Sequence, residues 1–190
     1  MDAEQIVVRA AVPADLPDVA AIYAHYVTTS VTTFEEVPPT PPDWRLRLED
    51  LAGRKLPFLV AEAADRSIGG YAYASPWRPK PAYRYTVEDT VYVSPAHTGR
   101  GLGRALLGAL LAACADAGAR QVIAVIADTG SDASAALPSV ALPSVALPSI
   151  ALPSVALHRR CGFAHAGRLS RVGRKHGQWI DTVLMQRELP

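Results

Sequence analysis

The sequence has few cysteines, no excess of charge of one sign and no uninterrupted apolar run long enough to cross a membrane. Its 190 residues include two cysteines, Cys114 and Cys161, which are too few for a disulfide framework and are not spaced as metal ligands. Nineteen Lys and Arg against eighteen Asp and Glu give a formal net charge of +1. Charge therefore predicts neither nucleic-acid nor membrane binding. From the two cysteines we expect a reduced, cytoplasmic protein without a metal.

A secretion signal and a membrane span are also disfavoured. The N-terminal sequence MDAEQIVVRA is acidic and has no apolar core, so we expect no signal peptide. Residues 133–157 carry no charge over a length that could cross a bilayer. Four prolines interrupt that run, and each removes a helical hydrogen bond that could not be replaced in lipid.

These prolines belong to a tandem repeat, PSVAL-PSVAL-PSIAL-PSVAL, over 138–157. Its period of five matches neither a helix nor a strand, so it presents no continuous apolar face. Two interpretations remain open: an interaction segment with exposed apolar side chains, or a duplication tolerated in a surface loop, which we favour. We predict a final helix that begins at Pro153, with Leu152 as its N-cap, and a non-helical excursion over 138–152.

Elsewhere helical and strand patterns alternate. Helices are predicted over 16–26, 41–53, 102–117 and near His158, with Asp15 as the N-cap of the first. Strands are predicted over 58–63, 68–75, 85–93, 121–127, 164–172 and 179–187. Strands outnumber helices and form hairpins, which predicts an α+β fold: a mixed, mostly antiparallel sheet flanked by helices. We expect one domain over 1–190 that carries the repeat as an insert.

The most informative motif is a glycine-rich turn between the predicted strand that ends at 93 and the helix that follows. It contains Gly99, Arg100, Gly101, Gly103 and Arg104. Glycines let backbone amides approach a ligand, and a helix N-terminus adds partial positive charge, so this turn suits a pyrophosphate. A plain helix start is the alternative, because a glycine-rich turn alone is a weak signal.

Two common phosphate-binding motifs do not fit this turn. It lies after three predicted strands rather than after the first, and no Gly-Lys-Ser/Thr follows it. From Thr98 to Gly103 it resembles the acyl-CoA site of the GNAT N-acyltransferase superfamily, whose motif is Gln/Arg-x-x-Gly-x-Gly/Ala. Thr98 departs from that motif, and we expect it to weaken rather than abolish cofactor affinity.

Longer strings resemble the phosphinothricin acetyltransferase branch of this superfamily. They lie at 22–27, 31–35, 71–84, 86–93, 173–179 and 181–186. The resemblance implies a GNAT fold, acetyl-CoA as co-substrate and a homodimer. It also implies acetylation of the α-amino group of phosphinothricin, methionine sulfone or methionine sulfoximine.

The resemblance also suggests catalytic residues. Glu88 aligns with the residue proposed as general base, although a solvated strand carboxylate is the commoner role for a glutamate. His176 aligns with a histidine suggested to assist, and a structural or substrate-contacting role is equally open. His158 occupies the helix position where many relatives carry a tyrosine that protonates the thiolate.

Binding residues follow from the same comparison. The residues expected to contact the cofactor are Val91, Tyr92, Val93, Gly99, Arg100, Gly101, Leu102, Gly103, Arg104 and Ser131, the last in place of the family's Asn. Those expected to contact the substrate are Phe34, Arg78, Lys80, Tyr83, Arg84, Glu88, Asp89 and Thr90. Guanidinium groups suit carboxylates and phosphinates because they bind both oxygens at once.

Two other functions remain open. One is acetylation of a different amine, such as a polyamine or an aminoglycoside, although the basic residues at 78, 80 and 84 argue against it. The other is a catalytically impaired protein that still binds acetyl-CoA, if the insert disturbs the site.

Overall fold

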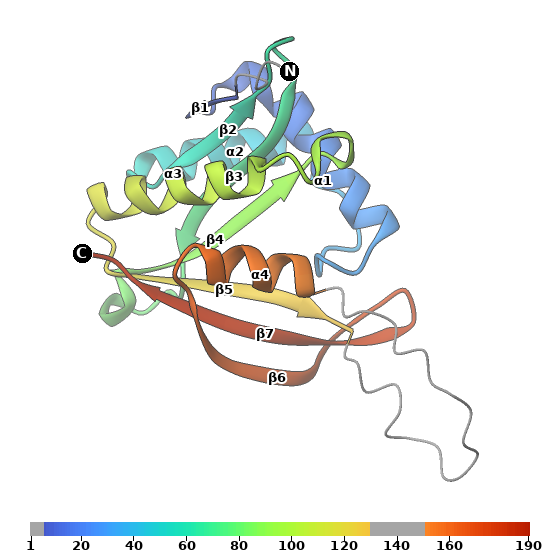
Figure 1. The fold of residues 1–190 in the computed structure, drawn as a ribbon, viewed down its shortest axis with the longest axis vertical. Coiled ribbons are helices and arrows are strands. Elements are labelled where there is room, and N and C mark those ends of the chain that lie inside the picture. The colour runs from blue at the N-terminus through green and yellow to red at the C-terminus, as the bar shows by residue number, and fades with distance from the viewer. Residues whose placement is uncertain (1–5, 130–150) are drawn as a thin grey trace.

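The computed structural model describes residues 6–129 and 151–190. The strands are β1 (Val7–Ala10), β2 (Phe58–Glu62), β3 (Ile68–Pro76), β4 (Thr86–Val93), β5 (Gln121–Asp128), β6 (Ala164–Lys175) and β7 (Gln178–Glu188). The helices are α1 (Leu16–Thr29), α2 (Pro41–Gly53), α3 (Leu102–Asp116) and α4 (Leu152–Arg160). The strands form one sheet in the order β1-β2-β3-β4-β5-β7-β6 (Figure 1), which confirms the predicted α+β arrangement.

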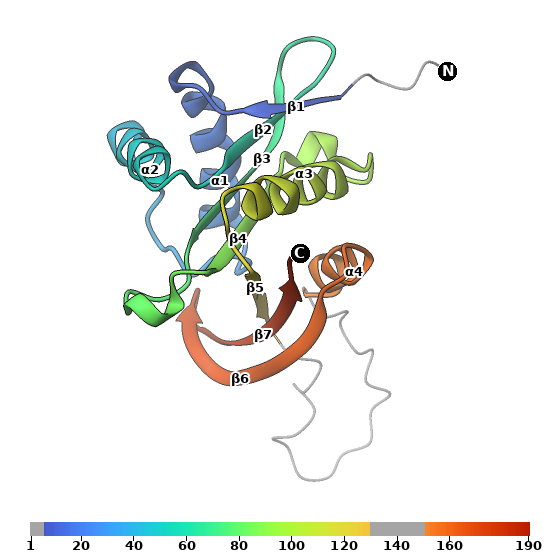
Figure 2. The same ribbon diagram turned by 90° about the vertical axis from the view of Figure 1, so that its left-hand side faces the viewer.

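Helices cover both faces of this sheet. Helices α1 and α2 lie on one face, and α3 and α4 on the other (Figure 2). The apolar positions of α1 recur three and four residues apart, so they form one stripe that packs with Trp44 and Tyr71 in the first core. The second core is built around Leu106, Leu110 and Val122 under α3.

Local hydrogen bonds fix where α1 and α2 begin. The Thr40 backbone N–H and hydroxyl both donate to the Asp43 carboxylate, at 2.7 and 2.6 Å, which caps α2. Asp15 precedes α1 as predicted, but its carboxylate does not cap that helix. It accepts from the Val12 N–H at 2.8 Å and from the Arg9 guanidinium at 2.7 and 2.8 Å, and so ties β1 to the turn.

The ends of the sheet differ from the sequence prediction. Strand β1 is absent from that prediction, because it has only four residues and lies at the edge. Strands β6 and β7 are longer than predicted and meet at a tight turn over 176–177. Most β6 side chains are exposed, so the sequence there lacks the apolar alternation that would reveal the length of the strand.

The central feature of the sheet is the parallel pairing of β4 with β5, since all other neighbours are antiparallel. This pairing spans only Thr86–Gln121 to Glu88–Ile123. Beyond Glu88 the two strands diverge (Figure 1), and each remains paired only on its outer side.

Helix α4 comes from the last repeat unit, as predicted. It begins at Leu152, one residue earlier than expected, with buried Ala151 as its N-cap. Pro153 thereby occupies one of the first two helical positions, where a missing N–H costs no intrahelical bond. The expected excursion lies outside the described residues over 138–150.

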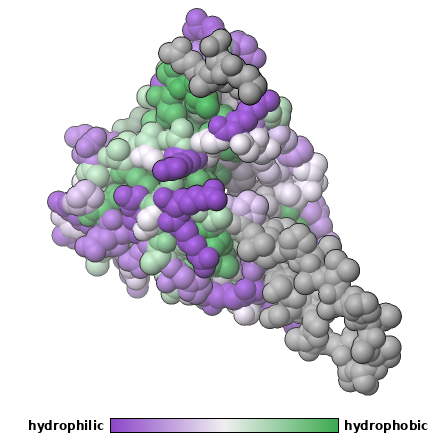
Figure 3. All heavy atoms as spheres, in the orientation of Figure 1, coloured by the Kyte–Doolittle hydropathy of each residue, from purple (hydrophilic) through white to green (hydrophobic). Residues whose placement is uncertain are grey.

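On the face seen in Figure 3, hydrophilic and hydrophobic residues are intermixed, as is usual for protein surfaces. None of the helices within residues 6–129 and 151–190 is long and apolar enough to cross a membrane.

Deletion of residues 138–157 tests how the repeat relates to α4. In the shortened chain Ser134 and Leu137 replace Ser154 and Leu157, and Asp132 comes to lie at the helix start, where an acidic side chain is favourable. We therefore expect a folded variant with an equal or higher melting temperature by circular dichroism. An unfolded variant would show that the repeat is a structural element.

Candidate active site

A large cavity of about 640 Å³ opens where β4 and β5 diverge. Its walls come from the α1 end, β4, the glycine-rich turn, β5 and α4. Its lining residues include Tyr23, Tyr26, Thr32–Phe34, Tyr73, Glu88–Val93, His97–Gly99, Gly101–Gly103, Ala124–Ala127, Pro153, Ser154, Leu157 and His158. The volume is in the range of sites for small molecules and cofactors.

The glycine-rich turn gives this cavity an anion-binding end. Gly99 and Gly101 have φ values of +76° and +84°, in the left-handed region that glycine adopts at little cost. A Cβ at either residue would meet no other atom within 4 Å, so the backbone itself faces open space. Gly101 is also the N-cap of α3, whose N-terminus carries partial positive charge.

Gly103 lines the large cavity, as predicted for a cofactor contact, and it also has a packing role. A Cβ at Gly103 would lie 3.3 Å from Leu157 Cδ2 and 3.7 Å from Val93 Cγ2. Its small size therefore allows α4 to pack against the start of α3. The Arg100 and Arg104 side chains do not line the large cavity, and Ser131 lies outside the described residues.

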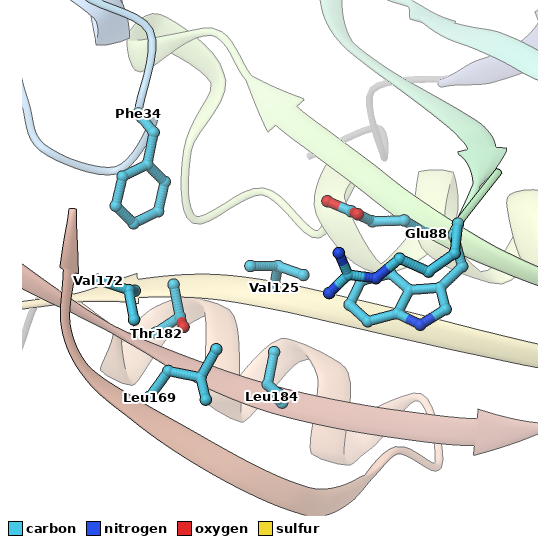
Figure 4. A pocket seen from close by; sticks show the side chains of 9 residues that line it. Phe34, Glu88, Val125, Leu169, Val172, Thr182 and Leu184 are labelled. Carbon is cyan, nitrogen blue, oxygen red and sulfur yellow. The ribbon is translucent and has the colours of Figure 1, made fainter.

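A small cavity of about 340 Å³ lies on the concave side of β5, β6 and β7 (Figure 4). It is lined by Phe34, Trp77, Arg78, Glu88, Val125, Leu169, Val172, Thr182 and Leu184. Phe34, Glu88 and Val125 line both cavities. The Glu88 carboxylate therefore lies at the junction of the two spaces.

Alternation along β4 aims Glu88 at this junction. Val87 packs in the core under α3 and Asp89 faces α4, so Glu88 between them points to the opposite face. Burial and the negative charge of Asp89 raise the pKa of Glu88, while Arg78 opposes the shift. A carboxylate with a raised pKa is a stronger base than an ordinary glutamate.

Asp89 and His158 form a buried pair on the other face of β4. The His158 Nε2 lies 3.0 Å from an Asp89 carboxylate oxygen, and its Nδ1 lies 2.7 Å from the Ser154 carbonyl oxygen. Since a carbonyl only accepts, Nδ1 carries a hydrogen, and a second proton lies between Nε2 and Asp89. Burial lowers the pKa of His158, but the Asp89 hydrogen bond and charge and the Ser154 carbonyl together raise it above its ordinary value.

The loop that carries Phe34 is fixed against the β6–β7 hairpin. A Cβ at Gly173 would overlap the Phe34 ring, so only glycine allows this approach. Lys175 is almost fully buried, and its Nζ donates to the Thr33 carbonyl at 3.0 Å. The Thr33 hydroxyl lies 2.6 Å from the Tyr23 hydroxyl. These contacts hold Phe34 in the wall that both cavities share.

Several predicted site residues lie elsewhere. His176 is exposed in the β6–β7 turn and lines neither cavity, whereas Glu88 lines both. Lys80, Tyr83 and Arg84 line neither cavity, because residues 79–84 are exposed to solvent. The Arg84 guanidinium lies 4.5 Å over the Tyr85 ring.

Asp89 and Thr90, predicted as substrate contacts, line the large cavity rather than the small one. Of the predicted substrate residues, only three line the small cavity: Phe34, Arg78 and Glu88.

Most of the small cavity was missed from the sequence. Val125, Thr182 and Leu184 share one face of the sheet because Val125 pairs with Leu184 and Ala127 with Thr182. Alternation along the last strand could have suggested this face. Val172 could not be found in that way, because it lies in an irregular part of β6 where the register shifts.

The described residues contain no cluster of three or more His, Cys, Asp or Glu side chains that could hold a metal. A glycine turn at one end of the large cavity and a carboxylate between the two cavities are features suited to group transfer by acid–base chemistry.

Comparison with known protein families shows to which family this chain belongs. A family model described as "Acetyltransferase (GNAT) family" matches residues 20–138. This chain belongs to the GNAT acetyltransferase family. The predicted acetyltransferase and GNAT fold are thereby confirmed.

Named relatives are similar over nearly the whole GNAT chain. A phosphinothricin N-acetyltransferase from Alcaligenes faecalis is 46% identical over 92% of this chain and 78% of its own length. An L-methionine sulfoximine/L-methionine sulfone acetyltransferase from Pseudomonas aeruginosa is 34% identical, with coverage of 96% and 94%. The crystal structure of a phosphinothricin acetyltransferase from Sinorhizobium meliloti with acetyl-CoA has a TM-score of 0.81 at 40% identity, with coverage of 97% and 88%.

Replacement of Gly101 by valine tests the glycine turn. At φ +84° a branched side chain is strained by about 1–2 kcal/mol, and it would also enter the open space beside the backbone amides. We expect weaker acetyl-CoA binding by calorimetry. Gly108→Val is the control, because Gly108 lies within α3, the helix that Gly101 caps, and a Cβ there would also meet no atom within 4 Å. Equal affinity of both variants would contradict the assignment.

The buried histidine pair predicts a titration. By NMR, His158 should titrate above its ordinary value of about 6.5, and Asp89→Asn should bring it below that value because burial then dominates. Since its pKa is raised on folding, His158 stabilises the fold fully below pH ~6.5, and this contribution is lost as the pH rises through the raised pKa. A wild-type value below 6.5 would contradict the described pair.

Proposed function

We propose that this GNAT protein transfers the acetyl group of acetyl-CoA to the α-amino group of a small amino-acid analogue, such as phosphinothricin, methionine sulfone or methionine sulfoximine. One observation carries the proposal. Glu88, a carboxylate with a raised pKa, lies where the cavity beside the glycine turn meets the small cavity. A base at that junction can act on an amine on one side while a thioester lies on the other.

The large cavity supports acetyl-CoA as the co-substrate. The amides at Gly99 and Gly101 and the start of α3 suit its phosphates. The diverged edges of β4 and β5, at 91–93 and 124–126, leave room for an extended, amide-containing arm. Two solved relatives, from Sinorhizobium meliloti and Salmonella typhimurium, are described as complexes with acetyl-CoA.

The small cavity supports an amino acid as the acceptor. Arg78 is the one cationic side chain among its lining residues, and it suits an α-carboxylate, while Glu88 suits the neighbouring amine. Most of the remaining wall is apolar. A polyamine or an aminoglycoside would require several carboxylates, and Glu88 is the one acidic residue in this lining.

Acetyl transfer requires two proton movements. The acceptor ammonium must lose a proton before its nitrogen forms a bond to the acetyl carbon, and the departing thiolate must gain one as the carbon–sulfur bond breaks. Glu88 is the candidate base for the first movement. His158 lines the large cavity and holds a proton, so it is the candidate acid for the second.

The resemblance also leads us to propose a homodimer in the cytoplasm. Leu169, Val172 and Trp179 are 46%, 53% and 54% exposed on the edge hairpin, and a second copy could cover them. Both cysteines are free and buried, in keeping with a reducing compartment. Analytical ultracentrifugation would measure the stoichiometry.

A catalytically impaired acetyl-CoA-binding protein is the second candidate, favoured by the tandem repeat, whose last unit forms the start of α4. Thiol release from acetyl-CoA with and without methionine sulfone separates the two functions. Release that depends on the acceptor supports the enzyme, whereas acetyl-CoA binding without release supports the binding protein.

Glu88→Gln tests the proposed base. We expect turnover to fall by ~10²-fold or more, with acetyl-CoA affinity nearly unchanged, because the amide cannot accept the proton. In the wild type, kcat/KM should fall as the pH drops through the raised pKa of Glu88, above the ordinary value of 4.5. Glu49→Gln, on the exposed side of α2, serves as the control. Near-wild-type turnover of Glu88→Gln at neutral pH would remove Glu88 from this role.

A further inference from the structure

The lining of the small cavity contains one hydroxyl group, that of Thr182, which the proposed reaction does not use. Thr182 is 3% exposed, and its hydroxyl oxygen has no hydrogen-bond partner among the described residues. A buried hydroxyl without a partner is unfavourable, since it loses its hydrogen bonds to water and gains none. Such a group on the wall of a binding cavity is therefore a candidate contact for a ligand.

Thr182 lies at the opposite end of the small cavity from the reacting groups. Its neighbours in the lining are apolar: Phe34, Val125, Leu169, Val172 and Leu184. Figure 4 shows Glu88 and Thr182 on opposite sides of Val125. The cavity thus has a charged end, an apolar middle and a single hydroxyl at the far end.

The strand register gives the separation of these ends along β5. Glu88 pairs with Ile123, and Thr182 pairs with Ala127, four residues further along β5. At about 3.3 Å per residue the two positions lie about 13 Å apart along the strand. The glutamate side chain and two hydrogen bonds occupy part of that length, which leaves room for an acceptor of methionine size.

We propose that Thr182 is a specificity-determining residue. Its hydroxyl hydrogen-bonds an oxygen on the side-chain sulfur or phosphorus of the acceptor, while Arg78 and Glu88 hold the carboxylate and the amine. In methionine sulfone and phosphinothricin this oxygen is separated from the amine by three carbons and the heteroatom. This inference rests on the proposed function and narrows its substrate class to oxidised, methionine-sized amino acids.

Physical chemistry explains why one hydroxyl can discriminate here. A sulfone or phosphinate oxygen that enters an apolar wall loses its hydrogen bonds to water, and Thr182 replaces one of them. The thioether of unmodified methionine needs no such partner. Thr182 should therefore favour the oxidised side chain, whereas a shorter polar side chain would not reach it.

The test compares two acceptors that differ only in the side-chain oxygens. In the full chain, kcat/KM for methionine sulfone and for methionine is measured with Thr182→Val, which keeps the shape and removes the hydroxyl, and with Thr182→Ser, which keeps the hydroxyl. We expect Thr182→Val to lower kcat/KM for methionine sulfone roughly 10- to 100-fold, mainly through KM, and to change that for methionine less than ~3-fold. Thr182→Ser should retain most of the preference.

Each other result overturns a distinct claim. Unchanged activity of Thr182→Val on methionine sulfone, or equal losses on both acceptors, would overturn the role of Thr182 and leave the proposed function intact. A folded wild-type chain that binds acetyl-CoA and acetylates neither amino acid would overturn the proposed function and this inference with it.

Discussion

The pairing of β4 with β5 ends at Glu88 and Ile123, and the site depends on that end point. Strands that stay paired would leave no space between them, whereas here each strand keeps only its outer neighbour and the sheet opens. Leu157 of α4 packs against Gly103, and His158 binds Asp89, so α4 forms a wall of the opening. Glu88, the candidate base, is the last residue of β4 that pairs with β5. It therefore lies at the apex of the large cavity, where the two strands begin to diverge.

Successive residues of β4 meet different environments, and their chemistry differs accordingly. Glu88 faces the junction of the cavities with its pKa raised by partial burial, and only the exposed Arg78 opposes the shift. Asp89, on the other face, shares a proton with His158 in the core. The wall opposite Glu88 is equally constrained, because Lys175 and Gly173 hold the Phe34 loop against β6. In the proposed reaction, a fixed wall on each side would keep the acceptor within reach of the candidate base.

Local sequence patterns predicted the features that depend on short stretches of chain, such as single strands and turns. The strand predicted over 85–93 corresponds to β4, and the glycines before α3 marked the turn that lines the large cavity. The small cavity could be predicted only in part, since its wall depends on the register of β5 with β7 and on the irregular segment of β6. The positive charge of Arg84 suggested a contact with the substrate. In the structure its guanidinium packs on the Tyr85 ring, and Arg84 lines neither cavity.

A crystal structure of the chain with CoA and methionine sulfone would test this account most directly. We predict CoA between residues 91–93 of β4 and 124–126 of β5, with its phosphates at the turn around Gly101 and its sulfur near Glu88. The acceptor amine should lie within hydrogen-bond reach of Glu88, on the side of the small cavity. Electron density for CoA outside the opening between β4 and β5, or for the acceptor remote from Glu88, would contradict the account.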